Sequence, residues 1–147
     1  GGGFTARARL ESLRPNFASA QQVPKAAARI RTEYLNYPSP QGSGTMRGYL
    51  ARPAYPAGRL PGVLVIHENR GLNPYIEDVT RRLAVANFVA FAPDALTPAG
   101  GSPGDEEKAE QLFSKLDPAK RNEDLVAAYD GRKARPQHTG NVGAVGF

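Results

Sequence analysis

The stretch GVLVIHENRGLNPYIEDVTRRLAVANFVAFA, residues 62–92, decides the fold of this chain. It begins with a short apolar run rich in β-branched residues, Gly62–Ile66, which is typical of a strand covered on both faces. A helix is predicted to start at Asn73-Pro74, because asparagine is a preferred N-cap and proline is favoured at the first helical position. A second apolar run, residues 88–92, follows. A strand, a helix and a strand joined by short connections predict a parallel βαβ unit.

Two further strand-like runs precede this unit, at residues 30–37 and 45–52. The segment between them, residues 38–44, is rich in proline, glycine and serine. Because these residues favour tight turns, the pattern predicts an antiparallel hairpin.

Downstream of the βαβ unit, the pattern predicts two more helices and another strand. An acidic helix start is predicted at Asp105-Glu106-Glu107, and Asp117-Pro118 is predicted to cap a further helix. This second helix is expected to turn Leu125, Val126 and Tyr129 inward. The small and apolar run VGAVGF, residues 142–147, predicts a buried strand that ends in Gly-Phe.

Composition limits the classes of function. The 147 residues are 40% hydrophobic and 22% charged, and they include no cysteine and two histidines. Disulfides, thiolate metal sites and a histidine-rich metal centre are therefore not expected, and we predict neither a metal nor a cofactor. No apolar run reaches the length of a transmembrane helix, so no membrane span is expected.

The net charge of +5 is concentrated at one end of the chain. Residues 1–31 carry six basic residues and one acid, whereas the remaining 116 residues carry 13 of each sign. Because a nucleic-acid reader normally places its basic patch on the folded module, nucleic acid is not predicted as a partner. We interpret residues 1–29 as a basic leader. Its run Ala18-Ser19-Ala20 resembles the end of an export signal, which leaves a cytoplasmic or a periplasmic location open.

Candidate chemistry follows the ends of the predicted parallel strands, where ligands bind in open α/β sheets. Glu68 comes directly after a buried strand, where a carboxylate is costly unless it has a partner. It could serve a reaction, or it could simply pair with Arg70 or cap the next helix. His67 is interpreted as a hydrogen-bonded packing residue. Asp94 is expected to bond to nearby backbone N–H groups.

These residues resemble the dienelactone hydrolase family of α/β-hydrolases, including bacterial carboxymethylenebutenolidases. The resemblance runs from about Tyr34 to Phe147 and rests on GVLVIHENRG at 62–71, the helix after Asn73, FAPD at 91–94 and VGAVGF at 142–147. It implies an α/β-hydrolase-type sheet, in which an antiparallel N-terminal hairpin is followed by parallel βαβ strands with flanking helices. Residues 30–147 would be the N-terminal part of one such domain, with the C-terminal half absent.

The resemblance also implies hydrolysis of a small-molecule ester or lactone by a cysteine placed just after Phe147. Gly146 and Phe147 would frame this nucleophile, Glu68 would help to generate its thiolate, and the backbone N–H of Asn69 would donate to the oxyanion. Arg70 is a weaker candidate for binding substrate. A complementary C-terminal segment would supply the nucleophile, the aspartate and the histidine.

Two features complicate this assignment. The Tyr and Arg with which the family binds substrate after Pro-Asp are replaced by ALTP, residues 95–98, which argues against dienelactone itself as the substrate. In addition, 147 residues without a nucleophile could form a catalytically inert α/β fragment. In that alternative the exposed last strand, 142–147, pairs with a complementary chain.

Overall fold

The structure is a computed structural model that describes residues 21–135 and 138–147. Most of the predicted basic leader therefore lies outside the described residues. The described chain forms one five-stranded sheet with the order β1-β2-β4-β3-β5. Its strands are β1 (Ile30–Ser39), β2 (Gly44–Pro53), β3 (Leu60–Ile66), β4 (Val89–Pro93) and β5 (His138–Gly146).

The pairing of the strands confirms both predicted motifs. β1 and β2 form the antiparallel hairpin, and β2 also pairs antiparallel with β4. β3 pairs in parallel with β4 on one side and with β5 on the other. The sheet is thus mixed, with an antiparallel part followed by a parallel part, as expected for the N-terminal part of an α/β-hydrolase fold.

The helices are α2 (Pro74–Val85), α3 (Glu106–Ser114) and α4 (Pro118–Lys133), with a short 3₁₀ turn, η1 (Thr97–Ala99). The two predicted caps, Asn73 and Asp117, are confirmed, and Asp105 caps the helix that it was predicted to start. The side chains of Asn73, Asp105 and Asp117 accept hydrogen bonds from backbone N–H groups in the first turns of the three helices, at 2.9, 3.0 and 2.9 Å respectively. Each helix therefore begins where its local sequence satisfies the free N–H groups of the first turn.

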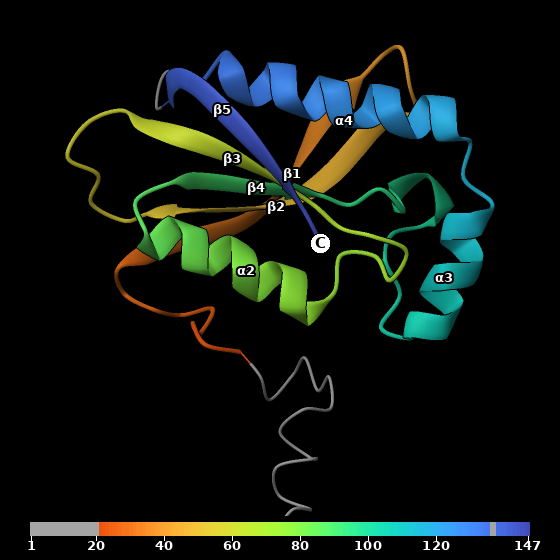
Figure 1. Cartoon of the computed structure of the whole chain (residues 1–147), viewed down its shortest axis with the longest axis horizontal. Helices are drawn as coiled ribbons and strands as arrows, with labels where there is room; N and C mark the ends of the chain where they lie inside the picture. The colour runs from red at the N-terminus through yellow and green to blue at the C-terminus, as the bar shows by residue number, and fades with distance from the viewer. Residues whose placement is uncertain (1–20, 136–137) are drawn as a thin grey trace, which may run out of the picture.

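The sheet lies between α2 on one face and α4 on the other (Figure 1). Because side chains alternate along a strand, the neighbours Leu64 and Val65 enter different cores. Leu64 belongs to the cluster that includes Phe91 and reaches α4 through Ala128. Val65 belongs to the cluster that reaches α2 through Ile76. β3 is therefore covered on both faces, as its continuous apolar run predicted.

Two predictions about burial are wrong. β5 was expected to be buried, but it lies at the edge of the sheet, and Val145 and Phe147 are each 38% exposed. No described element pairs with its outer edge. Val126 was expected to face inward and is 53% exposed, whereas Ala128 provides a buried apolar contact of α4.

Buried charged residues tie distant segments to the helices. Asp124 of α4 accepts hydrogen bonds from the hydroxyls of Ser39 and Ser43 at 2.6 Å each, and from the Ser43 backbone at 2.8 Å. Asp78 of α2 accepts from the backbone of Val23, and Arg81 donates to the carbonyl of the same residue. The hairpin turn is thus fastened to α4, and the segment before β1 to α2.

No helix in the described part of the chain is both long and apolar enough to cross a bilayer.

Candidate active site

The loop after β3 and the last residue of the sequence meet at one cavity. Gly146 ends β5 opposite Ile66, and the backbone N–H of Phe147 donates to the carbonyl of Ile66 at 2.9 Å. The cavity has a volume of about 430 Å³, and its lining includes Glu68, Asn69, Arg70, Tyr75, Glu110 and Phe147. The structure therefore brings together all the candidate site residues that the sequence predicted, with Gly146 next to the lining.

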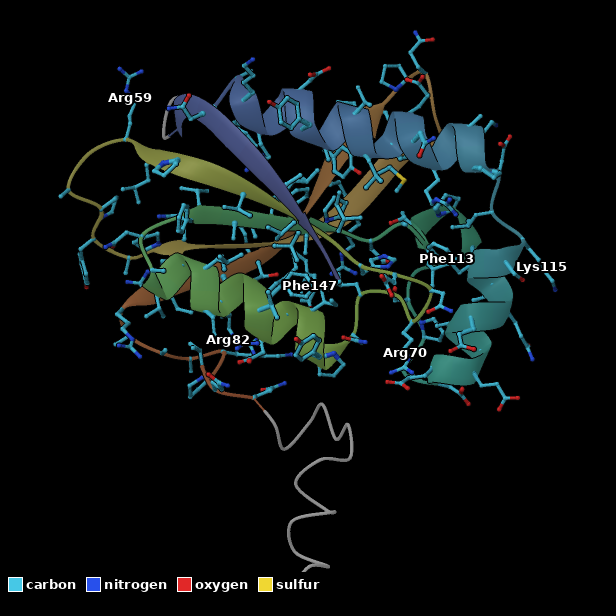
Figure 2. All side chains as sticks on the ribbon, viewed as in Figure 1. Arg59, Arg70, Arg82, Phe113, Lys115 and Phe147 are labelled. Carbon is cyan, nitrogen blue, oxygen red and sulfur yellow. The ribbon has the colours of Figure 1, made fainter. Side chains whose placement is uncertain are left out.

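The Glu68 side chain is exposed, although it follows a buried strand. Within residues 21–135 and 138–147 its carboxylate has no hydrogen bond or ion pair. Arg70, the expected structural partner, lies instead near two acids of α3, with its Nε 4.0 Å from Glu106 and 3.9 Å from Glu110 (Figure 2). The cap of α2 is Asn73. Neither structural explanation of Glu68 is therefore seen, and its carboxylate is available to a ligand.

The next residue, Asn69, offers a backbone donor at the same place. Residues 68–71 form a turn that is closed by a 3.2 Å hydrogen bond from the Gly71 N–H to the Glu68 carbonyl. Gly71 has a φ of +79°, which favours glycine because it lacks a Cβ. The N–H of Asn69 has no acceptor among the described residues, and both Glu68 and Asn69 line the cavity. A carboxylate and an unpaired N–H thus lie side by side.

His67 is buried and occupied on both ring nitrogens, as predicted for a packing residue. Its Nδ1 lies 2.6 Å from the Glu68 carbonyl oxygen, and its Nε2 accepts a 3.0 Å hydrogen bond from the backbone N–H of Ala95. Burial lowers the pKa of His67, and the charge of Arg121 acts in the same direction; the Glu68 carbonyl and Asp94 oppose them. We therefore assign a neutral imidazole that carries its proton on Nδ1.

Asp94 bonds to nearby backbone N–H groups, as predicted, but it also has a partner that the sequence did not reveal. Its carboxylate accepts from the N–H of Leu96 at 3.0 Å, and from the N–H and hydroxyl of Ser102 at 2.8 and 2.6 Å. The Ser102 oxygen in turn accepts from the N–H of Leu72 at 2.8 Å. Ser102 therefore braces the loop that carries Glu68 and Asn69. Nothing in its proline- and glycine-rich surroundings indicates this long-range contact.

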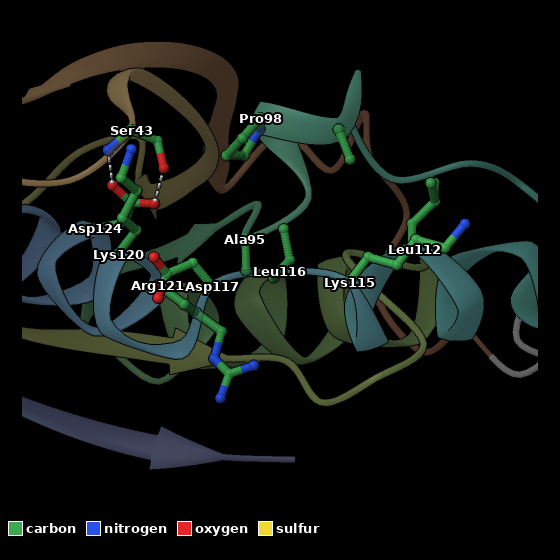
Figure 3. Close-up of a pocket in the computed structure, with 11 residues that line it drawn as sticks. Ser43, Ala95, Pro98, Leu112, Lys115, Leu116, Asp117, Lys120, Arg121 and Asp124 are labelled. Carbon is green, nitrogen blue, oxygen red and sulfur yellow. Dashed lines mark hydrogen bonds between the residues drawn. The ribbon is translucent and has the colours of Figure 1, made fainter.

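A second cavity, of about 470 Å³, is also lined by Glu68 and Asn69, and its other lining residues include Phe113, Leu125 and Arg121. The Arg121 guanidinium lies 4.7 Å from the centre of the Phe113 ring. A smaller space of about 320 Å³, which shares Ala95 and Arg121 with the second cavity, lies between η1, α3 and α4. Figure 3 shows Ser43 bonded to Asp124 in that smaller space, and Arg121 pointing away from the pair.

Ala95 lines the second cavity. No cluster of three or more potential metal ligands is found among the described residues. The side chains around the two cavities can accept a proton at Glu68, donate hydrogen bonds, and contact both apolar and anionic groups.

Comparisons with known proteins concern the family and the fold of the chain. A sequence model described as the dienelactone hydrolase family matches residues 46–147. A protein named "Putative hydrolase fragment YghX", from Escherichia coli K12, is 52% identical over 115 residues, which are 78% of this chain and 98% of that protein. A protein named "Putative carboxymethylenebutenolidase", from the same strain, is 38% identical over 77 residues, which are 52% of this chain and 28% of that protein.

Among solved structures, the dienelactone hydrolase-like promiscuous phosphotriesterase P91 from metagenomic libraries has a TM-score of 0.64 and 27% identity. The match covers 82% of this chain and 50% of that one, so the chain spans about half the length of this structural relative. The fold, the arrangement at the ends of β3 and β5, and the extent of the family match lead to one assignment: this chain belongs to the dienelactone hydrolase family, whose members are hydrolases.

Proposed function

We propose that this protein contributes the Glu68 side of an active site that hydrolyses carboxylic esters or lactones. The observation that carries the proposal is that the Glu68 carboxylate and the Asn69 N–H, both without a partner among the described residues, lie in the cavity that Phe147 borders. Acyl transfer needs a base that activates the nucleophile and a donor that stabilises the oxyanion. These two groups are of the required kinds.

In the proposed reaction the nucleophile is a cysteine that follows Phe147, as in the family pattern. Glu68 accepts the thiol proton, and the resulting thiolate forms a bond to the carbonyl carbon of the substrate. The carbonyl oxygen becomes an oxyanion that the Asn69 N–H stabilises. The C–O bond to the alcohol then breaks, the alcohol leaves with a proton, and water releases the acid from the thioester. The aspartate and histidine of the triad belong to a complementary C-terminal segment.

The two cavities that share Glu68 and Asn69 suggest how a substrate is placed. One is bordered by Arg70, Glu110 and Phe147, and the other by Phe113 and Arg121. The two sides of an ester or lactone would occupy one cavity each, with the carbonyl group at Asn69. Because Ala95–Pro98 replace the family's Tyr and Arg, we expect substrates other than dienelactone.

The test is the substitution Glu68→Gln in the full-length protein. Because Glu68 is exposed, the fold should persist, while ester turnover should fall by roughly a hundredfold, the usual scale for the loss of a general base. Glu107→Gln is the matched control, since it removes an exposed acid of α3 that lines neither of these cavities. Unchanged turnover in Glu68→Gln would remove this residue from the mechanism.

A second candidate, a catalytically inert fragment that pairs through its last strand, is favoured by the exposure of β5. Val145 and Phe147 are each 38% exposed at the sheet edge, and an open apolar edge invites pairing with another chain. Intact-mass analysis of the purified protein separates the two candidates. A second polypeptide in equal amount, beginning with cysteine or serine, supports the hydrolase. A single 15.7 kDa species without esterase activity supports the inert fragment.

A further inference from the structure

In the peptide group between Glu68 and Asn69, only the carbonyl oxygen has hydrogen-bond partners among the described residues. Its carbonyl oxygen accepts two hydrogen bonds, from His67 Nδ1 at 2.6 Å and from the Gly71 N–H at 3.2 Å. Its N–H, on Asn69, has no acceptor within the described residues. The C=O and N–H of a trans peptide point in opposite directions, so whatever fixes the carbonyl also fixes the direction of the N–H.

The imidazole of His67 is locked in the protonation state that this contact requires. A carbonyl oxygen can only accept and a backbone N–H can only donate, so Nδ1 carries the proton towards Glu68 and Nε2 receives the N–H of Ala95. The ring is almost fully buried, at 5% exposure, and meets Phe113 edge-on, with 6.2 Å between the ring centres. It cannot turn without breaking both hydrogen bonds.

We infer that His67 is a positioning residue for the oxyanion: by holding the Glu68 carbonyl, it aims the Asn69 N–H into the cavity and strengthens it as a donor. This inference rests on the proposed function, in which Asn69 stabilises the oxyanion. The strengthening follows because a peptide whose carbonyl accepts hydrogen bonds is polarised and donates better through its N–H. His67 itself does not touch the substrate.

Two variants of His67 distinguish a positioning role from a role in packing alone. In His67→Asn, the side-chain Nδ2 lies three bonds from Cα, as Nδ1 does, so a donor to Glu68 can be kept. In His67→Leu, an apolar side chain removes that donor. Both variants lose the acceptor for the N–H of Ala95, so both should lower the melting temperature, and their difference isolates the contact with Glu68.

The test measures ester hydrolysis by the full-length protein and both variants. We expect His67→Leu to lower kcat about tenfold or more with KM nearly unchanged, because an oxyanion donor acts mainly in the transition state. His67→Asn should recover most of kcat. Equal kcat values in the two variants, or a loss confined to KM, would overturn the inference.

A spectroscopic measurement decides the inference separately from the proposed function. In ¹⁵N-labelled full-length protein, His67 should show the neutral Nδ1–H form, and the amide signal of Asn69 should shift in His67→Leu much more than in His67→Asn. An Nε2–H form of the ring, or an Asn69 signal that moves equally in both variants, would contradict the positioning role. If the protein hydrolyses no ester while these shifts occur, the proposed function fails and the positioning of the peptide stands.

Discussion

The two strand ends that meet at the cavity, those of β3 and β5, are held in different ways. β3 pairs on both sides, and the loop after it is fixed by long-range hydrogen bonds from Ala95 to His67 and from Leu72 to Ser102. β5 lies at the edge, and Phe147 is joined to β3 by one backbone hydrogen bond and faces the ring of Tyr75 at 6.2 Å. The Glu68 side is thus shaped by side-chain contacts across the fold, and the Phe147 side mainly by backbone pairing.

The largest expected effect comes from removing the Asp94 hydrogen bonds, which hold Ser102 against the loop after β3. Asp94→Ala would leave the N–H groups of Leu96 and Ser102 without their acceptor, and we expect a loss of about 3 kcal/mol in the free energy of unfolding. The measurement is urea denaturation. Asp105→Ala, which removes an exposed helix cap, should cost about 1 kcal/mol. Equal losses in the two variants would show that the hydrogen bonds of Asp94 stabilise the fold no more than an exposed helix cap does.

A pair of valines compares the two strands directly, because Val65 of β3 lies opposite Val145 of β5 in the register. Val65 is fully buried and Val145 is 38% exposed. We expect Val65→Ala to lower the free energy of unfolding by about 2 kcal/mol and Val145→Ala by about 0.5 kcal/mol or less. Similar losses, measured by thermal or urea unfolding, would mean that β5 is covered in solution.

A pair of glycines tests how closely Ser102 packs against the loop after β3. Gly71 and Gly100 both have positive φ, at +79° and +98°, so alanine at either position should cost about 1 kcal/mol. A Cβ at Gly71 would also lie 2.6 Å from the Ser102 hydroxyl, whereas nothing lies within 4 Å at Gly100. Gly71→Ala should therefore exceed Gly100→Ala by roughly 0.5 kcal/mol in urea unfolding. If both variants lost the same free energy of unfolding, the Ser102 side chain would be shown to move aside at no cost.

The smallest expected effect is the pH dependence that His67 gives to the free energy of unfolding. The pKa of His67 is lowered in the folded protein, chiefly by burial, so the unfolded chain takes up a proton first as the pH falls. Its contribution to stability should be complete above the ordinary histidine pKa of 6.5 and should be lost as the pH falls through the lower pKa of the folded state. Unfolding free energies of the wild type and His67→Asn, compared from pH 7.5 to 5, should converge at acid pH. If the unfolding free energies of the two proteins stayed a constant distance apart over this pH range, the expected contribution of His67 would be contradicted.

Local sequence was enough to predict the main helices and strands, whereas most members of the candidate site were named from the resemblance to the dienelactone hydrolase family. Asn73-Pro74 and Asp117-Pro118 mark helix starts because a cap and its first turn are neighbours in sequence. The ends of parallel strands meet at one edge of the sheet, so Glu68 and Phe147 could be expected to lie close together. Their roles in the reaction remain predictions.

The burial of side chains and the long-range hydrogen bonds could not be predicted in the same way. The run VGAVGF has the composition of a covered strand, but its exposure depends on what lies across from it and not on its own residues. Ser102 bonds to Asp94 and Leu72, which are 8 and 30 positions away, and no periodicity encodes such a contact. Val126 was misplaced because the buried stripe of α4 consists of Asp124, Ala128 and Arg132. Two of these three residues are charged, so a search for apolar residues at helical spacing selects the wrong face of the helix.

The hydrogen bonds of Asp124 to the hairpin turn have a consequence for how the protein opens. Ser39 and Ser43 lie at the tip of the hairpin, where strand pairs usually fray first, yet both are joined to a buried carboxylate in the middle of the sequence of α4. Local opening of either element would release buried polar groups of the other. The hairpin tip and α4 should therefore exchange their amide protons with deuterium as a single cooperative unit.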